Sequence, residues 1–176
     1  MRIMLITMDN ADNITLSTET HEYFMLEAIK AAQIALEAGD VPIGAVIVKN
    51  GRIIARGWNQ REQLQDPTAH AEMIALTQAS EHVGSWRLYG CTMYVTLEPC
   101  TMCAGALILS RIDRVVFACP DPKTGAAGSL YNIFEEPRHN HRVEVESGVL
   151  EEPCSMMLSD FFRNRRKQIA EEKNSV

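Results

Sequence analysis

The chain has 176 residues, of which 46% are hydrophobic and 23% are charged, and its formal net charge is −6 at pH 7. This length fits one domain with short tails, and this composition is typical of a globular protein. No apolar run approaches the roughly 18 residues that a membrane-spanning helix needs, and the acidic balance argues against a protein that coats nucleic acid regardless of sequence.

The first residues and the cysteines indicate a cytoplasmic protein with no membrane association. Residues 1–8 contain one basic residue and a very short apolar stretch, without the longer apolar region and cleavage site of a secretory signal. Five cysteines, two of them in a tight pair, do not indicate a disulfide framework. We divide the chain into a flexible N-terminal tail (1–18), a globular domain (19–170) and a C-terminal tail (171–176).

Apolar periodicity predicts helices that alternate with strands. Phe24, Ala28, Ala31 and Ala35 recur at helical spacing, and Gly39 is placed to end that helix. The expected elements are, in chain order, a helix over 20–38, a hairpin of strands over 43–49 and 52–58, a helix over 68–80, a strand over 92–97, a helix over 100–109, strands over 114–118 and 143–145, and a helix over 154–171. This order predicts crossover connections and an α/β fold whose sheet is covered on both faces.

Two of the expected helices begin with the same local signal. Asp66-Pro67 and Glu98-Pro99 each place an acidic residue before a proline. A capping side chain followed by proline at the first helical position is typical of a helix N-terminus. We therefore predict that the helices over 68–80 and 100–109 begin directly after these pairs.

The same two helix starts carry residues suited to bind a metal. His70 together with Cys100 and Cys103 offers three ligands, which leaves the fourth position of a tetrahedral zinc ion open. Glu72 is not needed as a ligand, and a carboxylate beside a catalytic zinc can accept and pass on the protons of a water molecule. We expect the two helix N-termini to converge with the zinc between them, and their partial positive charge to favour thiolates.

Other uses of these residues stay open at this point. The Cys100–Cys103 pair also fits a redox dithiol, and a structural metal would need a fourth ligand at matching spacing. The remaining cysteines are isolated and are interpreted as core or loop thiols; they are Cys91, Cys119 and Cys154. A catalytic zinc accounts best for Glu72. The pattern H-x-E followed by P-C-x-x-C is the known signature of zinc deaminases that act on nucleobases, which predicts a hydrolytic deamination.

Longer motifs indicate a narrower family within the zinc deaminases. The chain contains Gly57-Trp58-Asn59, Arg114-Val115-Val116-Phe117, the loop K-T-G-A-A-G-S over 123–129 and the run L-S-D-F-F over 158–162. With these motifs it resembles the bacterial tRNA-specific adenosine deaminases, which belong to the cytidine-deaminase-like superfamily. The resemblance implies a three-layer α/β/α fold with a mixed, mostly parallel five-stranded sheet, and a zinc-dependent deaminase domain over 19–170.

The resemblance also implies a substrate and the residues that contact it. It implies conversion of the wobble adenosine of a tRNA anticodon, in an arginine tRNA, to inosine by a homodimer with one zinc ion per subunit and no organic cofactor. By position, Asn59 would bind the flipped base, and Asp121 and Lys123 would line the approach of the anticodon stem-loop. Phe162 and Arg165 would contact the flanking nucleotides. An anticodon loop offers its base outside a stack at low cost.

Two further functions compete with this one. A deaminase of the same superfamily that acts on a free base or nucleoside, such as guanine or cytosine, would not need the basic terminal helix or the loop with Asp121 and Lys123. A non-catalytic zinc-binding subunit, which supports a deaminase partner, would not need Glu72.

Overall fold

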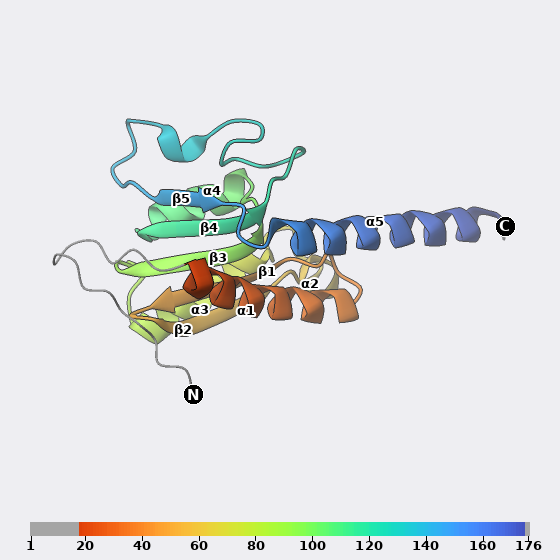
Figure 1. Ribbon diagram of the computed structural model, residues 1–176, viewed down its shortest axis with the longest axis horizontal. Coiled ribbons are helices and arrows are strands. Elements are labelled where there is room, and N and C mark those ends of the chain that lie inside the picture. The colour runs from red at the N-terminus through yellow and green to blue at the C-terminus, as the bar shows by residue number, and fades with distance from the viewer. Residues whose placement is uncertain (1–17, 175–176) are drawn as a thin grey trace.

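The computed structural model describes residues 18–174, which form one five-stranded sheet between helices (Figure 1). The elements are α1 (Thr18–Glu37), β1 (Gly44–Lys49), β2 (Arg52–Trp58), α2 (Arg61–Leu64), α3 (Ala71–Val83), β3 (Cys91–Leu97), α4 (Thr101–Leu109), β4 (Arg114–Cys119), the short 3₁₀ helix η1 (Ile133–Glu135), β5 (Glu144–Ser147) and α5 (Glu151–Asn174). The flexible tail predicted over 1–18 lies outside the described residues except for Thr18, where α1 begins. Residues 171–174 of the predicted C-terminal tail continue α5.

The strands of the sheet follow the order β2-β1-β3-β4-β5. β1 is antiparallel to both β2 and β3, whereas β4 is parallel to both β3 and β5. Four strands therefore run in one direction and β1 alone opposes them. The predicted mixed, mostly parallel sheet is confirmed.

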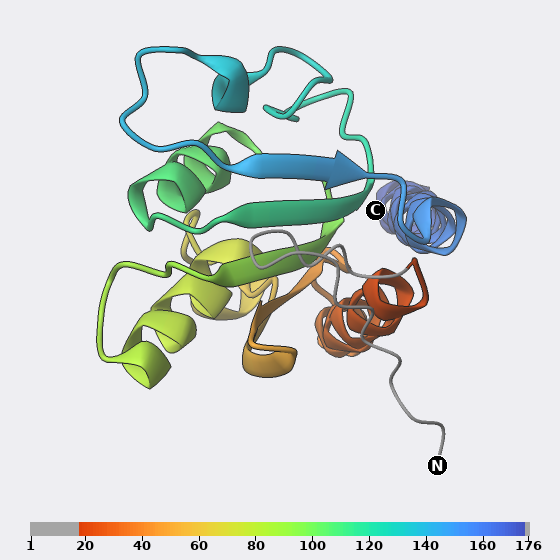
Figure 2. The same ribbon diagram turned by 60° about the vertical axis from the view of Figure 1, so that its left-hand side comes forward.

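Helices cover both faces of the sheet, as the alternation of elements predicts. α3 and α4 pack on one face, and α1 and α5 pack on the other (Figure 2). Each face has its own core, which includes Leu76 and Leu107 on the first face and Phe24 and Leu158 on the second. None of the helices within residues 18–174 combines the length and the apolar character that a bilayer crossing requires.

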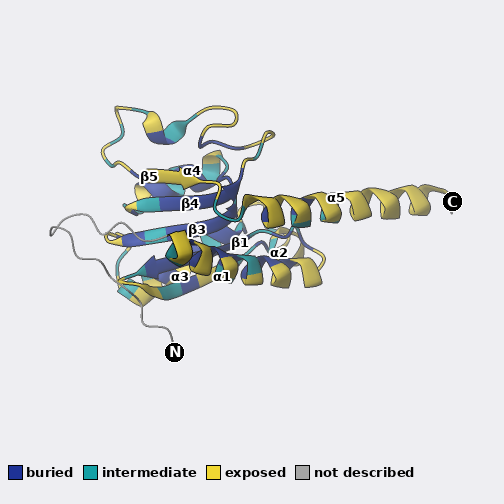
Figure 3. Ribbon diagram, in the orientation of Figure 1, coloured by how far each residue is buried: buried dark blue, intermediate teal, exposed yellow. Residues whose placement is uncertain are grey.

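α5 packs against the sheet only near its beginning. Cys154 and Leu158 are its buried residues, and most of the helix is exposed and extends away from the sheet (Figure 3). The first turns of α5 therefore attach the helix to the domain, and its later turns are accessible to another molecule.

The helices α3 and α4 begin later than predicted. Asp66 does not cap α3, because it accepts hydrogen bonds from the backbone N–H and the hydroxyl of Thr68, at 2.7 Å each, and so forms a separate turn. α3 begins at Ala71 with His70 as its N-cap residue. α4 begins at Thr101, also beyond the predicted acidic cap. The residue at the cap of each helix is thus a candidate metal ligand.

Candidate metal centre

His70 is placed by the close packing of α3 on β2. Gly57 of β2 permits this approach, because a Cβ atom there would lie 2.2 Å from the carbonyl oxygen of Ala71. The backbone of His70 is extended, with φ −77° and ψ 152°, and its N–H donates to the carbonyl of Thr68 at 2.7 Å. The imidazole is therefore held at the N-terminal end of α3 and not along its side.

Cys100 and Cys103 lie at the start of α4, which follows β3. Cys100 is the N-cap residue, and Cys103 is buried in the first turn. The Nδ1 atom of His70 is 3.7 Å from Sγ of Cys100 and 3.5 Å from Sγ of Cys103. The ligand atoms of all three residues lie within 4.8 Å of one another. The prediction that the two helix N-termini converge is confirmed.

This group of three donors fits a zinc ion. One imidazole nitrogen and two sulfurs are ligands that zinc prefers, and three protein ligands leave one tetrahedral position open. Hydrogen bonds from Cys103 and His70 outweigh burial and lower the pKa of Cys100 to about 4. The hydrogen bond to Cys100, together with burial, raises the pKa of Cys103. The group therefore carries a thiolate at neutral pH, and its charge is complementary to a divalent cation.

Glu72 is buried beside these ligands without being one of the three. Its exposed fraction is 4%, and it lies in the first turn of α3. Burial raises the pKa of Glu72, and this effect outweighs the positive charge of His70 and a hydrogen bond from Cys103, both of which lower it. A carboxyl group with a raised pKa exchanges protons closer to neutral pH than an ordinary glutamate does.

Asn59 follows β2 and is buried, with an exposed fraction of 2%. Its Nδ2 atom donates to Oδ1 of Asp40 at 2.7 Å. Asp40 is itself fully buried, and its carboxylate also accepts the backbone N–H groups of Val41 and Glu62 at 2.8 and 2.9 Å. The Asn59 side chain is therefore held in one orientation by a fixed acceptor.

The structure brings Lys123 and Phe162 together, although they are far apart in the sequence. The Nζ atom of Lys123 lies 5.9 Å from the centre of the Phe162 ring, which is 42% exposed and so is not a core residue. Asp121 accepts hydrogen bonds from the N–H of Lys123 at 2.9 Å and from the hydroxyl of Thr124 at 2.5 Å. Arg165 is exposed on the next turn of α5.

Sequence reasoning missed two buried carboxylates close to the site. Asp40 lies between the end of α1 and the start of β1, and nothing in the local sequence separates it from an ordinary turn residue. The sequence around Glu98 predicts a helix cap, whereas its carboxylate accepts hydrogen bonds from Asp121, Ala127 and Ser129. For Glu98 alone the sequence offers a signal, since this acidic residue lies two positions before Cys100.

Known proteins resemble this chain over most of its length. Residues 18–119 match the family model of the cytidine and deoxycytidylate deaminase zinc-binding region. The tRNA-specific adenosine deaminase of Bacillus subtilis (strain 168) is 57% identical over 154 residues, which are 87% of this chain and 96% of that protein. The chain belongs to the tRNA-specific adenosine deaminase family. The zinc-binding region that the family model describes contains His70, Cys100 and Cys103.

Solved structures agree with membership of the tRNA-specific adenosine deaminase family. A structure from a study of A-to-I editing by tRNA:A34 deaminases at the wobble position of transfer RNA is 43% identical, with a TM-score of 0.73, and the match covers 77% of this chain and 99% of that chain. The guanine deaminase of Bacillus subtilis is 42% identical with a TM-score of 0.54, but that match covers 57% of this chain and 64% of that one. The deaminase fold is therefore shared with both, and the longer likeness is to the tRNA:A34 deaminase structure.

Proposed function

We propose that this protein hydrolytically deaminates the wobble adenosine of a tRNA anticodon to inosine, with release of ammonia, and that its substrate is an arginine tRNA. One observation carries the proposal: the buried carboxyl of Glu72 lies beside a convergent group of one imidazole and two thiols. The identity of 57% to a tRNA-specific adenosine deaminase supports the choice of substrate.

The proposed chemistry assigns a separate task to each group. His70, Cys100 and Cys103 would hold one zinc ion per chain. Zinc, when bound in such a site, lowers the pKa of a water molecule to near 7 and so makes a nucleophile available at neutral pH. Glu72 would take a proton from the attacking water and deliver protons to the ring nitrogen and then to the departing amino group. Water thus adds to the ring carbon, the carbon–nitrogen bond breaks and ammonia leaves.

The start of α4 would assist this step. A helix N-terminus has N–H groups without partners inside the helix and carries partial positive charge. The N–H of Cys103 is one of these groups, and its hydrogen bond to the thiol of Cys100 contributes to lowering the pKa of that thiol. These N–H groups are directed toward the metal group and would stabilise negative charge that develops there.

The substrate contacts are proposed on the positions of five residues. Asn59, held by Asp40, would form a hydrogen bond with the flipped base. Asp121 and Lys123 would line the approach of the anticodon loop. Phe162 offers an exposed ring on which a flanking base can stack, and Arg165 offers a cation for a phosphate.

The assembly and the location belong to the same proposal. The family resemblance supports a homodimer, and a tRNA substrate supports a cytoplasmic protein. An acidic total charge is compatible with binding an RNA loop, because a local group of basic residues on α5 is sufficient for that contact. These are Arg163, Arg165, Arg166 and Lys167.

The deciding experiment offers the purified protein an anticodon stem-loop with adenosine at the wobble position. We expect about one zinc ion per chain and conversion of that adenosine to inosine, which is read as guanosine on reverse transcription. Free guanine and cytosine serve as competing substrates, with ammonia release as the measurement. An unchanged stem-loop together with ammonia release from either free base would overturn the tRNA assignment, and no turnover of any substrate would favour a non-catalytic subunit.

A further inference from the structure

We infer that Glu98 is a positioning residue whose carboxylate holds residues 121–129, the substrate loop hereafter, against the metal-ligand turn at Cys100. The inference rests on the proposed function, because the substrate loop carries Asp121 and Lys123, which are proposed to meet the RNA. Glu98 would set the distance between the RNA and the metal centre without touching either.

The carboxylate of Glu98 binds both ends of the substrate loop. Glu98 follows β3, and its exposed fraction is 3%. Oε2 accepts the N–H of Asp121 at 2.9 Å and the hydroxyl of Ser129, and Oε1 accepts the N–H groups of Ala127 and Ser129 at 2.8 and 3.0 Å. One buried side chain therefore receives four hydrogen bonds from the beginning and the end of the same loop. Bonds to an ionised acceptor are stronger than those between neutral groups.

The middle of the substrate loop is packed directly on the metal-ligand turn. Gly125 forms an isolated bridge with Cys100, and the N–H of Ala126 donates to the carbonyl of Pro99 at 2.9 Å. The contact leaves no room for a side chain, because a Cβ atom on Gly125 would lie 2.3 Å from Oε2 of Glu98. The loop thus lies between the carboxylate and the turn that carries the first cysteine.

Any shift of the substrate loop would be transmitted to α5. The loop is braced internally, since Asp121 accepts hydrogen bonds from Lys123 and Thr124. Lys123 in turn lies 5.9 Å from the ring centre of Phe162 on α5. The position that Glu98 imposes on the loop therefore also sets how Lys123 meets Phe162.

A purely structural role for Glu98 makes a different prediction. A variant that only folds less well has a smaller active fraction, which lowers the apparent kcat and leaves KM unchanged. A variant whose loop is displaced binds the RNA less tightly, which raises KM. Separate measurement of kcat and KM therefore distinguishes a folding defect from a displaced loop, provided that the zinc content is measured on the same preparation.

The test compares Glu98→Gln with the wild-type protein on the anticodon stem-loop. Both carboxylate oxygens face N–H groups, so the amide of glutamine must turn its own N–H₂ toward a donor whichever way it points. We expect KM to rise about tenfold or more, which is the effect of losing one buried hydrogen bond, with kcat and zinc content within about twofold of wild type. Hydrogen exchange at Asp121, Ala127 and Ser129 should accelerate, while that of α3 and α4 should not.

Two further variants keep the test decisive. Ser129→Ala removes one donor and should change KM in the same direction by a smaller factor, and it serves as the test if Glu98→Gln does not fold. Glu136→Gln alters a partly exposed carboxylate outside the substrate loop, whose hydrogen bonds are to Arg138, and should change nothing. An unchanged KM with unchanged exchange in both site variants, or loss of zinc from Glu98→Gln, would overturn the inference. Failure of the wild-type protein to convert the stem-loop would refute the proposed function instead, and the exchange comparison would still show whether Glu98 holds the loop.

Discussion

Asp40 fixes the direction in which the Asn59 amide points. A carboxylate only accepts hydrogen bonds, so the N–H₂ end of Asn59 must face Asp40, at 2.7 Å, and the carbonyl oxygen must face the opposite way. Because both residues are buried, water does not compete for this hydrogen bond, and the amide keeps its orientation. If Asn59 binds the flipped base as proposed, Asp40 therefore sets which of its amide groups faces that base.

We expect Asp40→Asn to lower kcat/KM on the stem-loop about tenfold to a hundredfold, with zinc retained. The new amide would place a donor against the N–H groups of Val41 or Glu62 or against Asn59, and an unpaired buried group costs about 1–3 kcal/mol. Asp113→Asn is the matched control, because Asp113 also accepts a backbone N–H, that of Gly90, at a separate place. Equal losses in the two variants would contradict the role of Asp40.

Glu72→Ala should retain its metal and lose nearly all turnover. Removal of a group that transfers protons in the rate-determining step costs typically 10²–10⁴-fold. Metal analysis and single-turnover conversion of the stem-loop on the same sample provide the measurement. A variant that loses its zinc would mean that Glu72 belongs to the ligand set.

Cys103→Ala should lose the metal and the thermal stability that the metal confers. The wild-type protein treated with a chelator should show the same fall in melting temperature, because a ligand that binds only the folded state stabilises it. Cys91→Ala is the control, since Cys91 is an equally buried cysteine outside the group of three donors. A metal-free Cys91→Ala protein would show that the stability loss is not specific to the ligands.

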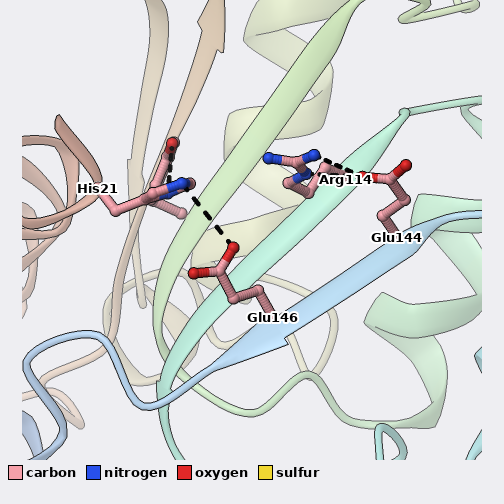
Figure 4. Close-up of polar contacts among 5 residues, drawn as sticks. His21, Arg114, Glu144 and Glu146 are labelled. Atoms are coloured by element: carbon pink, nitrogen blue, oxygen red, sulfur yellow. Dashed lines mark hydrogen bonds and ion pairs between the residues drawn. The ribbon is translucent and has the colours of Figure 1, made fainter. Parts of the chain in front are cut away.

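The free energy of unfolding should fall as the pH is lowered below about 6.5, the ordinary pKa of histidine, and His21 should account for part of that fall. His21 is buried against Tyr94 and faces Glu146, with Arg114 nearby (Figure 4). Burial lowers the pKa of His21, an effect that Arg114 reinforces and Glu146 opposes. Burial also raises the pKa of Tyr94, so its hydroxyl remains a donor.

The sign of this effect follows from the direction of the shift. The folded state binds a proton at His21 less readily than the unfolded state does, so stability is complete above the unfolded pKa and is lost as the pH falls toward the folded one. Urea unfolding of wild type and His21→Gln across pH 5–8 is the measurement, with the exposed His82→Gln as the control. A curve for His21→Gln that is as steep as wild type would exclude His21 as the source.

Arg165→Ala should weaken binding of the stem-loop and reduce its dependence on salt. A lysine or arginine that contacts a phosphate releases about one counterion, so the slope of log K against log salt should become shallower by about 0.7–0.9. Lys173→Ala, which removes a cation from the last turn of the same helix, is the control. Identical slopes for Arg165→Ala and wild type would remove Arg165 from the proposed interface.

The metal centre could be predicted from the sequence because its residues are close to local signals. His70 and the Cys100–Cys103 pair lie at chain positions where helices begin, and helix N-termini that follow neighbouring parts of one sheet point to the same edge. The acidic residues were harder to interpret. Asp66 and Glu98 both look like helix caps in the sequence. In the structure, Asp66 instead forms a separate turn with Thr68, and Glu98 binds a loop 23 to 31 residues away.

Asp40 shows the limit of local sequence reasoning more clearly. Its partner Asn59 lies 19 residues away, and the two meet only because the β1–β2 hairpin returns the chain to the end of α1. Burial of a carboxylate is unfavourable unless its oxygens accept hydrogen bonds. The donors to Asp40 come from three places in the chain, at Val41, Asn59 and Glu62. No periodicity or spacing in the sequence predicts that these donors meet Asp40.

The separation of the metal ligands along the chain has a consequence for synthesis of the protein. His70 precedes α3, whereas Cys100 and Cys103 follow β3, and β3 joins the sheet beside β1. A nascent chain emerging from the ribosome would possess the full donor set only after Cys103 has emerged and β3 has paired. Zinc would therefore bind no earlier than the stage at which three of the five strands, β2, β1 and β3, are in place.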